Sequence, residues 1–225
     1  MDFHPTIVAV LTGFVSGLLI SIPVGPVNLT IMNEGARRGF KWAALIGAGA
    51  LLMEIIYCAI AFTSFAALFQ KGMVKAVMQV FSFAFMMFLG FKFLLAKSVP
   101  VMDRLEHGIE ARIEEKLHPT SAFMTGFVRT LANPGVLAGW VILSANFVSW
   151  GWVEPTLKSK LLCLAGVAGG VGLWFFGLSW AISLGHKRYT ESTMLKMERG
   201  SGVALLAFGL AQGALLAWQL AKHKL

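Results

Sequence analysis

Long apolar segments alternate with short polar segments along the whole chain. A helix that crosses a bilayer needs about 20 predominantly apolar residues, and six segments are long enough. Polar and apolar residues do not alternate at every second position within them, as they do in the strands of membrane barrels. The pattern therefore predicts an all-α integral membrane protein with six spans, at about 6–31, 42–69, 73–95, 121–149, 158–184 and 200–220.

The connections between these spans are short, with one exception at about 97–120. This connection carries an apolar residue at every fourth position among charged residues. Such spacing is typical of an amphipathic helix. We expect a single transmembrane domain in which this interfacial linker joins two sets of three spans, at about 1–96 and about 121–225.

The composition agrees with the hydropathy pattern. Hydrophobic residues make up 57% of the chain, charged residues 13%, and the mean hydropathy is +0.73, whereas soluble domains are about 45–50% apolar and about 25% charged. The net charge is +8, but the basic residues lie between the apolar runs and do not form one stripe. This distribution argues against nucleic-acid binding.

The basic residues also predict an orientation. The connections at 33–41, 92–120 and 185–199 share one side of the membrane and together carry twelve lysine and arginine residues, against six on the other side. Cytoplasmic connections are the ones enriched in lysine and arginine. We therefore expect both termini to face outward.

Glycine pairs with small-xxx-small spacing recur inside the spans. This spacing lets helix backbones approach closely in a membrane. It indicates close helix packing and does not point to a particular function. The pairs are Gly13/Gly17, Gly135/Gly139, Gly166/Gly170 and Gly209/Gly213.

The first predicted span contains helix breakers at membrane depth. The segment SIPVGPVN places Pro23, Gly25 and Pro26 just before Asn28. Proline lacks a backbone donor and clashes with the preceding helical turn, and unpaired backbone groups are costly in hydrocarbon. Broken backbone is tolerated at this depth where it is buried in protein or lines a cavity.

A second break lies in the fourth predicted span, where TLANPGVL places Asn133 before Pro134. Pro134 follows Pro26 by 108 residues, which is about the length of a three-span repeat. Because three is an odd number, the second set of spans must insert upside down relative to the first. Paired interruptions in two inverted halves point to a transporter site, so we predict that the two breaks bind a polar solute.

An acidic residue, Glu54, lies near the middle of the second predicted span. Acids inside a membrane are expensive and by default functional, and burial favours their neutral form. Glu54 is therefore a candidate proton carrier; pairing with a cationic solute and a structural hydrogen bond are the alternatives. Tyr57 lies on the same helix face as Glu54. We expect its hydroxyl to bond either Glu54 or the solute, or its ring simply to pack against its neighbours. Arg129, in the fourth span, reaches the interface or holds a solute carboxylate.

Two other classes of function remain as alternatives. Cys58 and Cys163 lie in the second and fifth spans, as in a membrane thiol–disulfide electron carrier, but neither has the basic neighbour that activates a thiol. A divalent cation exporter needs more hard ligands than one carboxylate and a few amides. The histidines fall in connections or ends: His4, His107, His118, His186 and His223. We expect no metal site and, since no HExxH motif occurs, no enzyme.

Three stretches of the chain resemble the LysE/RhtB family of amino-acid exporters. SIPVGPVNLTIMNEGARRGFKWAALIGAGALLMEIIY is similar to the opening of that family, with its Pro-Gly-Pro or Pro-x-Gly-Pro break, asparagine, basic turn and acid. RTLANPGVLAGWVILSANFV is similar to the family's fourth span and MERGSGVALLAFGLAQGALLA to its closing span.

The resemblance implies a six-helix protein of the bacterial inner membrane, with two inverted three-helix halves. It implies proton-coupled export of an amino acid or related small solute, as an antiporter, without a cofactor. Glu54 takes the place of an acid that is usually aspartate, and Gly135 stands where lysine often follows Asn-Pro, so no particular solute is assigned. The expected partners are this solute and the lipid bilayer, and the oligomeric state, including a homo-oligomer, stays open.

Overall fold

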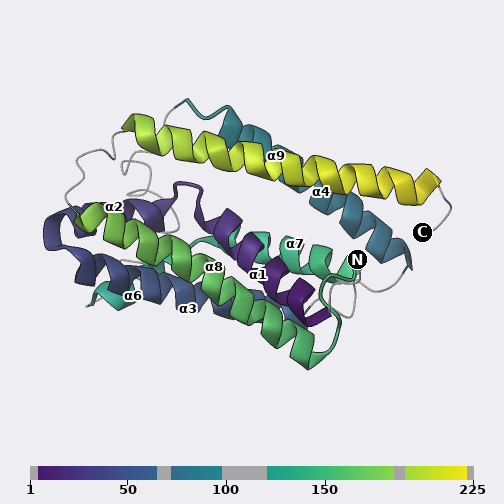
Figure 1. Cartoon of the computed structure of the whole chain (residues 1–225), viewed down its shortest axis with the longest axis horizontal. Helices are drawn as coiled ribbons and strands as arrows, with labels where there is room; N and C mark the ends of the chain where they lie inside the picture. The colour runs from purple at the N-terminus through teal and green to yellow at the C-terminus, as the bar shows by residue number, and fades with distance from the viewer. Residues whose placement is uncertain (1–4, 65–71, 98–120, 185–190, 222–225) are drawn as a thin grey trace.

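The computed structural model describes residues 5–64, 72–97, 121–184 and 191–221 (Figure 1). The regular structure in these ranges is helical, as predicted. The predicted interfacial linker lies almost wholly outside them, as do all five histidines. The helices are α1 (Pro5–Ser21), α2 (Pro26–Arg38), α3 (Phe40–Ser64), α4 (Gly72–Leu94), α6 (Ala122–Leu131), α7 (Pro134–Ser149), α8 (Leu157–Ser183) and α9 (Glu191–Ala221).

These helices are those of a multi-pass membrane protein. In the described ranges, α3, α8 and α9 are each long and apolar enough to cross a bilayer, and the bent pairs α1–α2 and α6–α7 each qualify as one broken span. The predicted span at 73–95 corresponds to α4, whose described apolar stretch is Gln79–Leu94. Large apolar side chains such as Phe88, Leu173 and Leu210 are exposed on the outer surface, as expected for helices that face lipid.

Both predicted helix breaks are present. The axes of α1 and α2 meet at 72° and those of α6 and α7 at 66°. Each second helix starts with its proline, Pro26 or Pro134, at the first helical position. There the missing N–H removes no intrahelical bond and the fixed φ suits the helix.

Two helices extend beyond the predicted spans. Residues 33–38, expected in a connection, complete α2, and Glu34 forms an i,i+4 ion pair of 3.0 Å with Arg38 in its last turn. Only Gly39 separates α2 from α3, at a φ of +82° that favours glycine. The last helix begins near residue 191 instead of 200, and Arg199 of this polar extension donates to Ala96 O at 3.0 Å.

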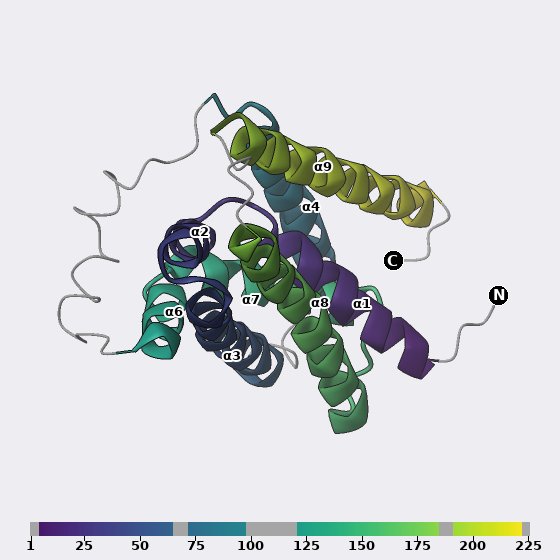
Figure 2. The ribbon, with the colours of Figure 1, turned by 60° about the vertical axis from the view of Figure 1, so that its left-hand side comes forward.

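The described helices form a body and a second layer. In the body, α8 packs against α1 and α3, and α3 packs in turn against α2, α6 and α7 (Figure 2). The second layer consists of α4 and α9, which pack along each other. Contacts between the two groups run chiefly from α7 to α4 and from α1 to α9.

Glycines set the closest helix approaches in the body. A Cβ on Gly170 of α8 would collide with the carbonyl oxygen of Phe14 in α1, and a Cβ on Gly126 of α6 would collide with that of Ile46 in α3. Only a residue without a side chain allows backbones this close. The spacing of small residues therefore correctly predicted packing, here between α1 and α8.

Candidate functional site

The first break is stabilised by the side chain of Asn28, which is buried. Its Nδ2 donates to the carbonyl oxygens of Ser21 at 2.9 Å and Pro23 at 2.7 Å. The last carbonyls of a helix lack intrahelical partners, so Asn28 replaces bonds that the break removes. Its Oδ1 accepts from Trp174 Nε1 of α8 at 3.1 Å, which fixes the break to a long span.

The start of α2 is open. Gly25 provides no side-chain cap for this helix, and a Cβ placed on Gly25 would meet no atom within 4 Å. Pro26 has no N–H, so the amides of Val27 and Asn28 are the first donors of α2, and neither has an intrahelical acceptor. Uncapped amides at a helix N-terminus, with its positive dipole end, are suited to bind an anionic group.

The second break is stabilised by two side chains. Asn133 Oδ1 caps α7 by accepting from the backbone N–H of Gly135 at 3.0 Å. The hydroxyl of Tyr57, on α3, donates to the carbonyl oxygen of Leu131 at 2.7 Å. Tyr57 thus pairs a carbonyl at the end of α6, a partner that the sequence did not indicate.

Replacing Tyr57 with phenylalanine is expected to destabilise the protein by about 1–3 kcal/mol, because it removes the partner of the Leu131 carbonyl at a partly buried bond. The thermal unfolding midpoint in detergent measures the effect. Thr63→Val is the matched control, since the Thr63 hydroxyl is exposed and bonds only carbonyls of its own helix. Equal midpoints for Tyr57→Phe and the wild type would show that this bond contributes nothing.

Glu54 lies on α3 at only 5% exposure. Its carboxylate Oε2 accepts a hydrogen bond from Trp140 Nε1 of α7. Trp140 is completely buried, and Met53 and Tyr57 beside Glu54 belong to the same hydrophobic core. The acid therefore sits in a low-dielectric interior and is bonded to the half-helix that follows the second break.

A hydrogen bond joins the two broken spans. Arg129 of α6, four residues before Asn133, donates from its guanidinium to Thr30 Oγ1 of α2. The Thr30 hydroxyl donates in turn to Pro26 O at 2.7 Å. Arg129 thus bonds a residue one turn into α2, at a partly buried position, and it brings a positive charge close to the start of that helix.

The predicted site residues lie in two groups in the structure. Pro23, Gly25, Pro26 and Asn28 form the first break, while Glu54 and Tyr57 lie beside the second, which Asn133 and Pro134 form. The Arg129–Thr30 bond connects the groups.

Sequence reasoning missed Trp140, Trp174 and Thr30. The available signal was the position of both tryptophans well inside a span, away from the interface where this residue usually lies. An indole N–H in the interior needs an acceptor, and the polar acceptors in the neighbouring spans were few.

The alternative chemistries depend on metal ligands and on the two cysteines. No three histidine, cysteine, aspartate or glutamate residues gather there as ligands for a metal ion. Cys58 and Cys163 are free thiols, both at 0% exposure in the core.

The chain is similar to one protein family and to a bacterial relative. It matches the family described as LysE type translocator over residues 18–213, a range that contains both breaks and Glu54. It is 25% identical over 203 residues to a Bacillus subtilis (strain 168) protein named "Putative amino acid efflux protein YcgF", and the alignment covers 90% of this chain and 94% of that relative. No solved structure matches the chain.

Proposed function

The chain belongs to the LysE type translocator family, whose members are transporters and not enzymes, and from this premise we propose that it exports an amino acid in exchange for protons. The observation that carries the proposal is the hydrogen bond that joins the two broken spans, from Arg129 of α6 to Thr30 of α2. Broken spans of this kind provide backbone and side-chain groups for a polar solute. The name of the Bacillus relative indicates an amino acid.

We propose that the solute lies between the two breaks. The open start of α2, after Pro23 and Gly25, binds the α-carboxylate through backbone amides, and the charge of Arg129 assists. The Tyr57 hydroxyl donates to Leu131 O and keeps lone pairs that accept from the solute's ammonium group. Asn28, Asn133 and Pro134 hold the two breaks in place.

Glu54 carries the coupling proton in this proposal. Its carboxyl group is buried beside the second break and bonded to Trp140. A buried acid of this kind exchanges a proton when the site opens to water on one side. Proton entry and solute exit then alternate through the same pair of breaks.

Matching glycine contacts support two inverted three-helix halves. A Cβ on Gly17 of α1 would approach Val167 O of α8 to 2.9 Å, and a Cβ on Gly126 of α6 would collide with Ile46 O of α3. Gly126 follows Gly17 by 109 residues, and Val167 follows Ile46 by 121. The α1–α8 contact thus corresponds to the α6–α3 contact.

A second pair of contacts repeats these intervals. A Cβ on Gly170 of α8 would collide with Phe14 O of α1, and a Cβ on Gly49 of α3 would collide with Phe123 O of α6. Phe123 follows Phe14 by 109 residues and Gly170 follows Gly49 by 121. Equal intervals at two contacts are expected from a two-fold axis in the membrane plane, the symmetry of inverted repeats.

The distribution of basic residues supports an orientation with both termini outside a bacterial inner membrane. One end of the molecule, on the left in Figure 1, holds the end of α2 and the start of α9; α1 begins and α9 ends at the other. By the positive-inside rule, the left end is cytoplasmic. Among described residues that end carries Arg37, Arg38, Lys41, Lys92, Lys97, Lys196 and Arg199, and the opposite end carries Lys75, Lys158 and Lys160.

Transport into liposomes tests the proposed function. Purified protein in liposomes with an acidic lumen is offered each of the twenty amino acids in labelled form. Since protons leave the lumen as solute enters, we expect at least one amino acid to accumulate above its external concentration. A protonophore should abolish the accumulation. If none of the twenty enters faster than into protein-free liposomes, the proposal is wrong.

A further inference from the structure

A second group of buried polar side chains lies where α4 and α9 pack against α7, apart from both breaks. None of its five members is more than 3% exposed. Asn146 follows Trp140 by six residues, which is about 9 Å along the axis of α7. The members of this carboxamide cluster are Gln79 and Ser82 of α4, Asn146 and Ser149 of α7, and Gln212 of α9.

Hydrogen bonds satisfy only part of the carboxamide cluster. Asn146 Nδ2 donates to Gln212 Oε1 at 2.9 Å, and Gln79 Nε2 makes a long bond of 3.5 Å to Ser149 O. Four buried polar atoms of the cluster have no hydrogen-bond partner among the residues that the structure describes: Gln79 Oε1, Ser82 Oγ, Asn146 Oδ1 and Gln212 Nε2. These four atoms come from all three helices.

Unpaired polar atoms are unfavourable in this position. Burying a polar atom without a hydrogen bond costs free energy, and apolar residues of similar shape would be as stable or more stable. Polar side chains inside a membrane bundle commonly mark a solute pathway. The arrangement is therefore better explained by a second state in which these atoms gain partners.

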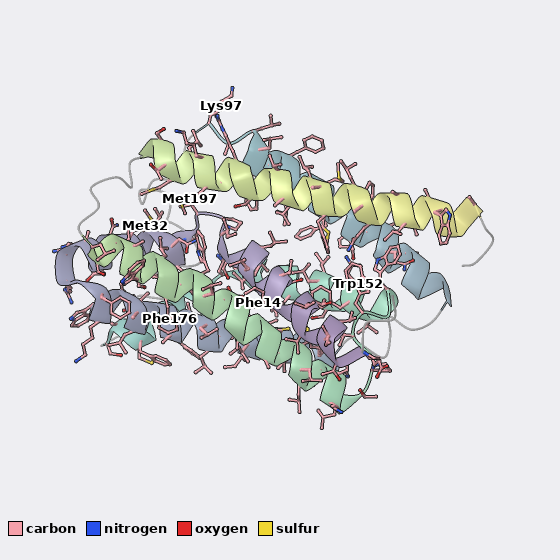
Figure 3. All side chains as sticks on the ribbon, in the orientation of Figure 1. Phe14, Met32, Lys97, Trp152, Phe176 and Met197 are labelled. Atoms are coloured by element: carbon pink, nitrogen blue, oxygen red, sulfur yellow. The ribbon has the colours of Figure 1, made fainter. Side chains whose placement is uncertain are left out.

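The carboxamide cluster lies at a boundary where such a state can form. The layer of α4 and α9 contacts the body chiefly through α7 and α1. At one end of this boundary, Trp152 lies between the two groups of helices (Figure 3), with its ring 5.8 Å from that of Phe208 in α9. Separation of the layer from α7 would open the carboxamide cluster without disturbing the glycine contacts of the body.

We propose that the carboxamide cluster is a second binding station for the exported solute, occupied when the layer of α4 and α9 separates from α7. This inference rests on the proposed function. Gln79 Oε1, Asn146 Oδ1 and Ser82 Oγ accept from the ammonium group of an amino acid. Gln212 Nε2 and the Ser82 hydroxyl donate to its carboxylate.

The chemistry of the carboxamide cluster also selects a class of solute. None of its five side chains is charged, so a net charge on the solute would have no counter-charge there, and a buried unpaired charge is strongly unfavourable. The two opposite charges of a zwitterion instead match the donors and acceptors. We therefore expect amino acids with uncharged side chains to be the solutes that this station binds.

The test compares a double variant, Gln79→Leu with Ser82→Ala, with the wild type in liposomes. Both replacements keep approximate shape and remove two of the unpaired atoms, together with the long bond from Gln79 Nε2 to Ser149 O. We expect the half-saturating concentration of the transported neutral amino acid to rise by about tenfold or more, while the thermal unfolding midpoint stays equal or rises. Val80→Ala with Phe81→Leu, on the exposed face of α4, is the matched control and should leave half-saturation unchanged.

Each outcome is decisive. Unchanged half-saturation in the double variant, together with an equal or higher unfolding midpoint, would overturn the second station and leave the proposed function standing. If the double variant does not fold, Ser82→Ala alone takes its place, because it removes a hydroxyl without a partner; unchanged half-saturation there overturns the station as well. Absence of transport by the wild type would overturn both proposals.

Discussion

Replacing Glu54 with glutamine is expected to abolish pH-driven accumulation of the solute while leaving solute–solute exchange intact. The glutamine Oε1 can still accept the hydrogen bond from Trp140 Nε1, and the side-chain volume barely changes, so folding is preserved. The amide cannot release a proton, and the variant behaves as a carrier that is always neutral at this position. Transport down a solute gradient then continues without coupling to protons.

The measurement uses liposomes in two modes. In the first, an acidic lumen drives uptake of labelled amino acid; in the second, unlabelled amino acid inside exchanges with labelled amino acid outside at equal pH. Glu198→Gln is the matched control, because Glu198 is also a buried acid, at 7% exposure, but lies on α9, which belongs to neither broken span. It should retain both modes.

The two modes separate the roles considered for Glu54. Normal pH-driven uptake by Glu54→Gln would exclude the coupling role. Loss of exchange as well as pH-driven uptake, in a variant that unfolds at the wild-type temperature, would also contradict it and would assign Glu54 to solute binding, because a coupling residue is dispensable for exchange.

Features that depend on local sequence could be predicted. The two breaks follow from Pro26 and Pro134, because a proline inside a helix removes a backbone hydrogen bond and clashes with the preceding turn, which kinks or breaks the helix. The apolar runs predict spans from length alone, and an acid within one of them, Glu54, marks a site for energetic reasons. These inferences need no knowledge of which helices meet.

Features that depend on which helices meet could not be predicted. Glu54 and Trp140 are 86 residues apart, Tyr57 and Leu131 O are 74 apart, and no local pattern connects either pair. The carboxamide cluster is a similar case, since each of its residues looks like an ordinary polar residue within its own span. Helix ends also depended on tertiary contacts, as where Arg199 bonds Ala96 O and the charged residues beside it remain helical.

Replacing Gly126 with alanine is expected to destabilise the protein by about 3 kcal/mol or more. This is the upper end of the cost usually found when a larger side chain is inserted into a packed core. The new Cβ would collide with the carbonyl oxygen of Ile46, and a helix backbone cannot rotate away as a side chain can. Separation of α6 from α3 would follow, with loss of the Tyr57–Leu131 bond between them. A large drop in the thermal unfolding midpoint and in the yield of monodisperse protein should be measured.

Gly177→Ala is the matched control. A Cβ there would meet no atom within 4 Å, and the residue lies inside α8, so alanine should stabilise the helix by about 0.5–1 kcal/mol.

Two further replacements extend the test to the proposed repeat. Gly49→Ala and Gly170→Ala place a Cβ against Phe123 O and Phe14 O, and these positions correspond by the same intervals in the chain. If the halves are inverted copies that use one contact twice, the two replacements should lower the midpoint by similar amounts; a drop in one alone would mean that the α1–α8 and α3–α6 contacts are not equivalent.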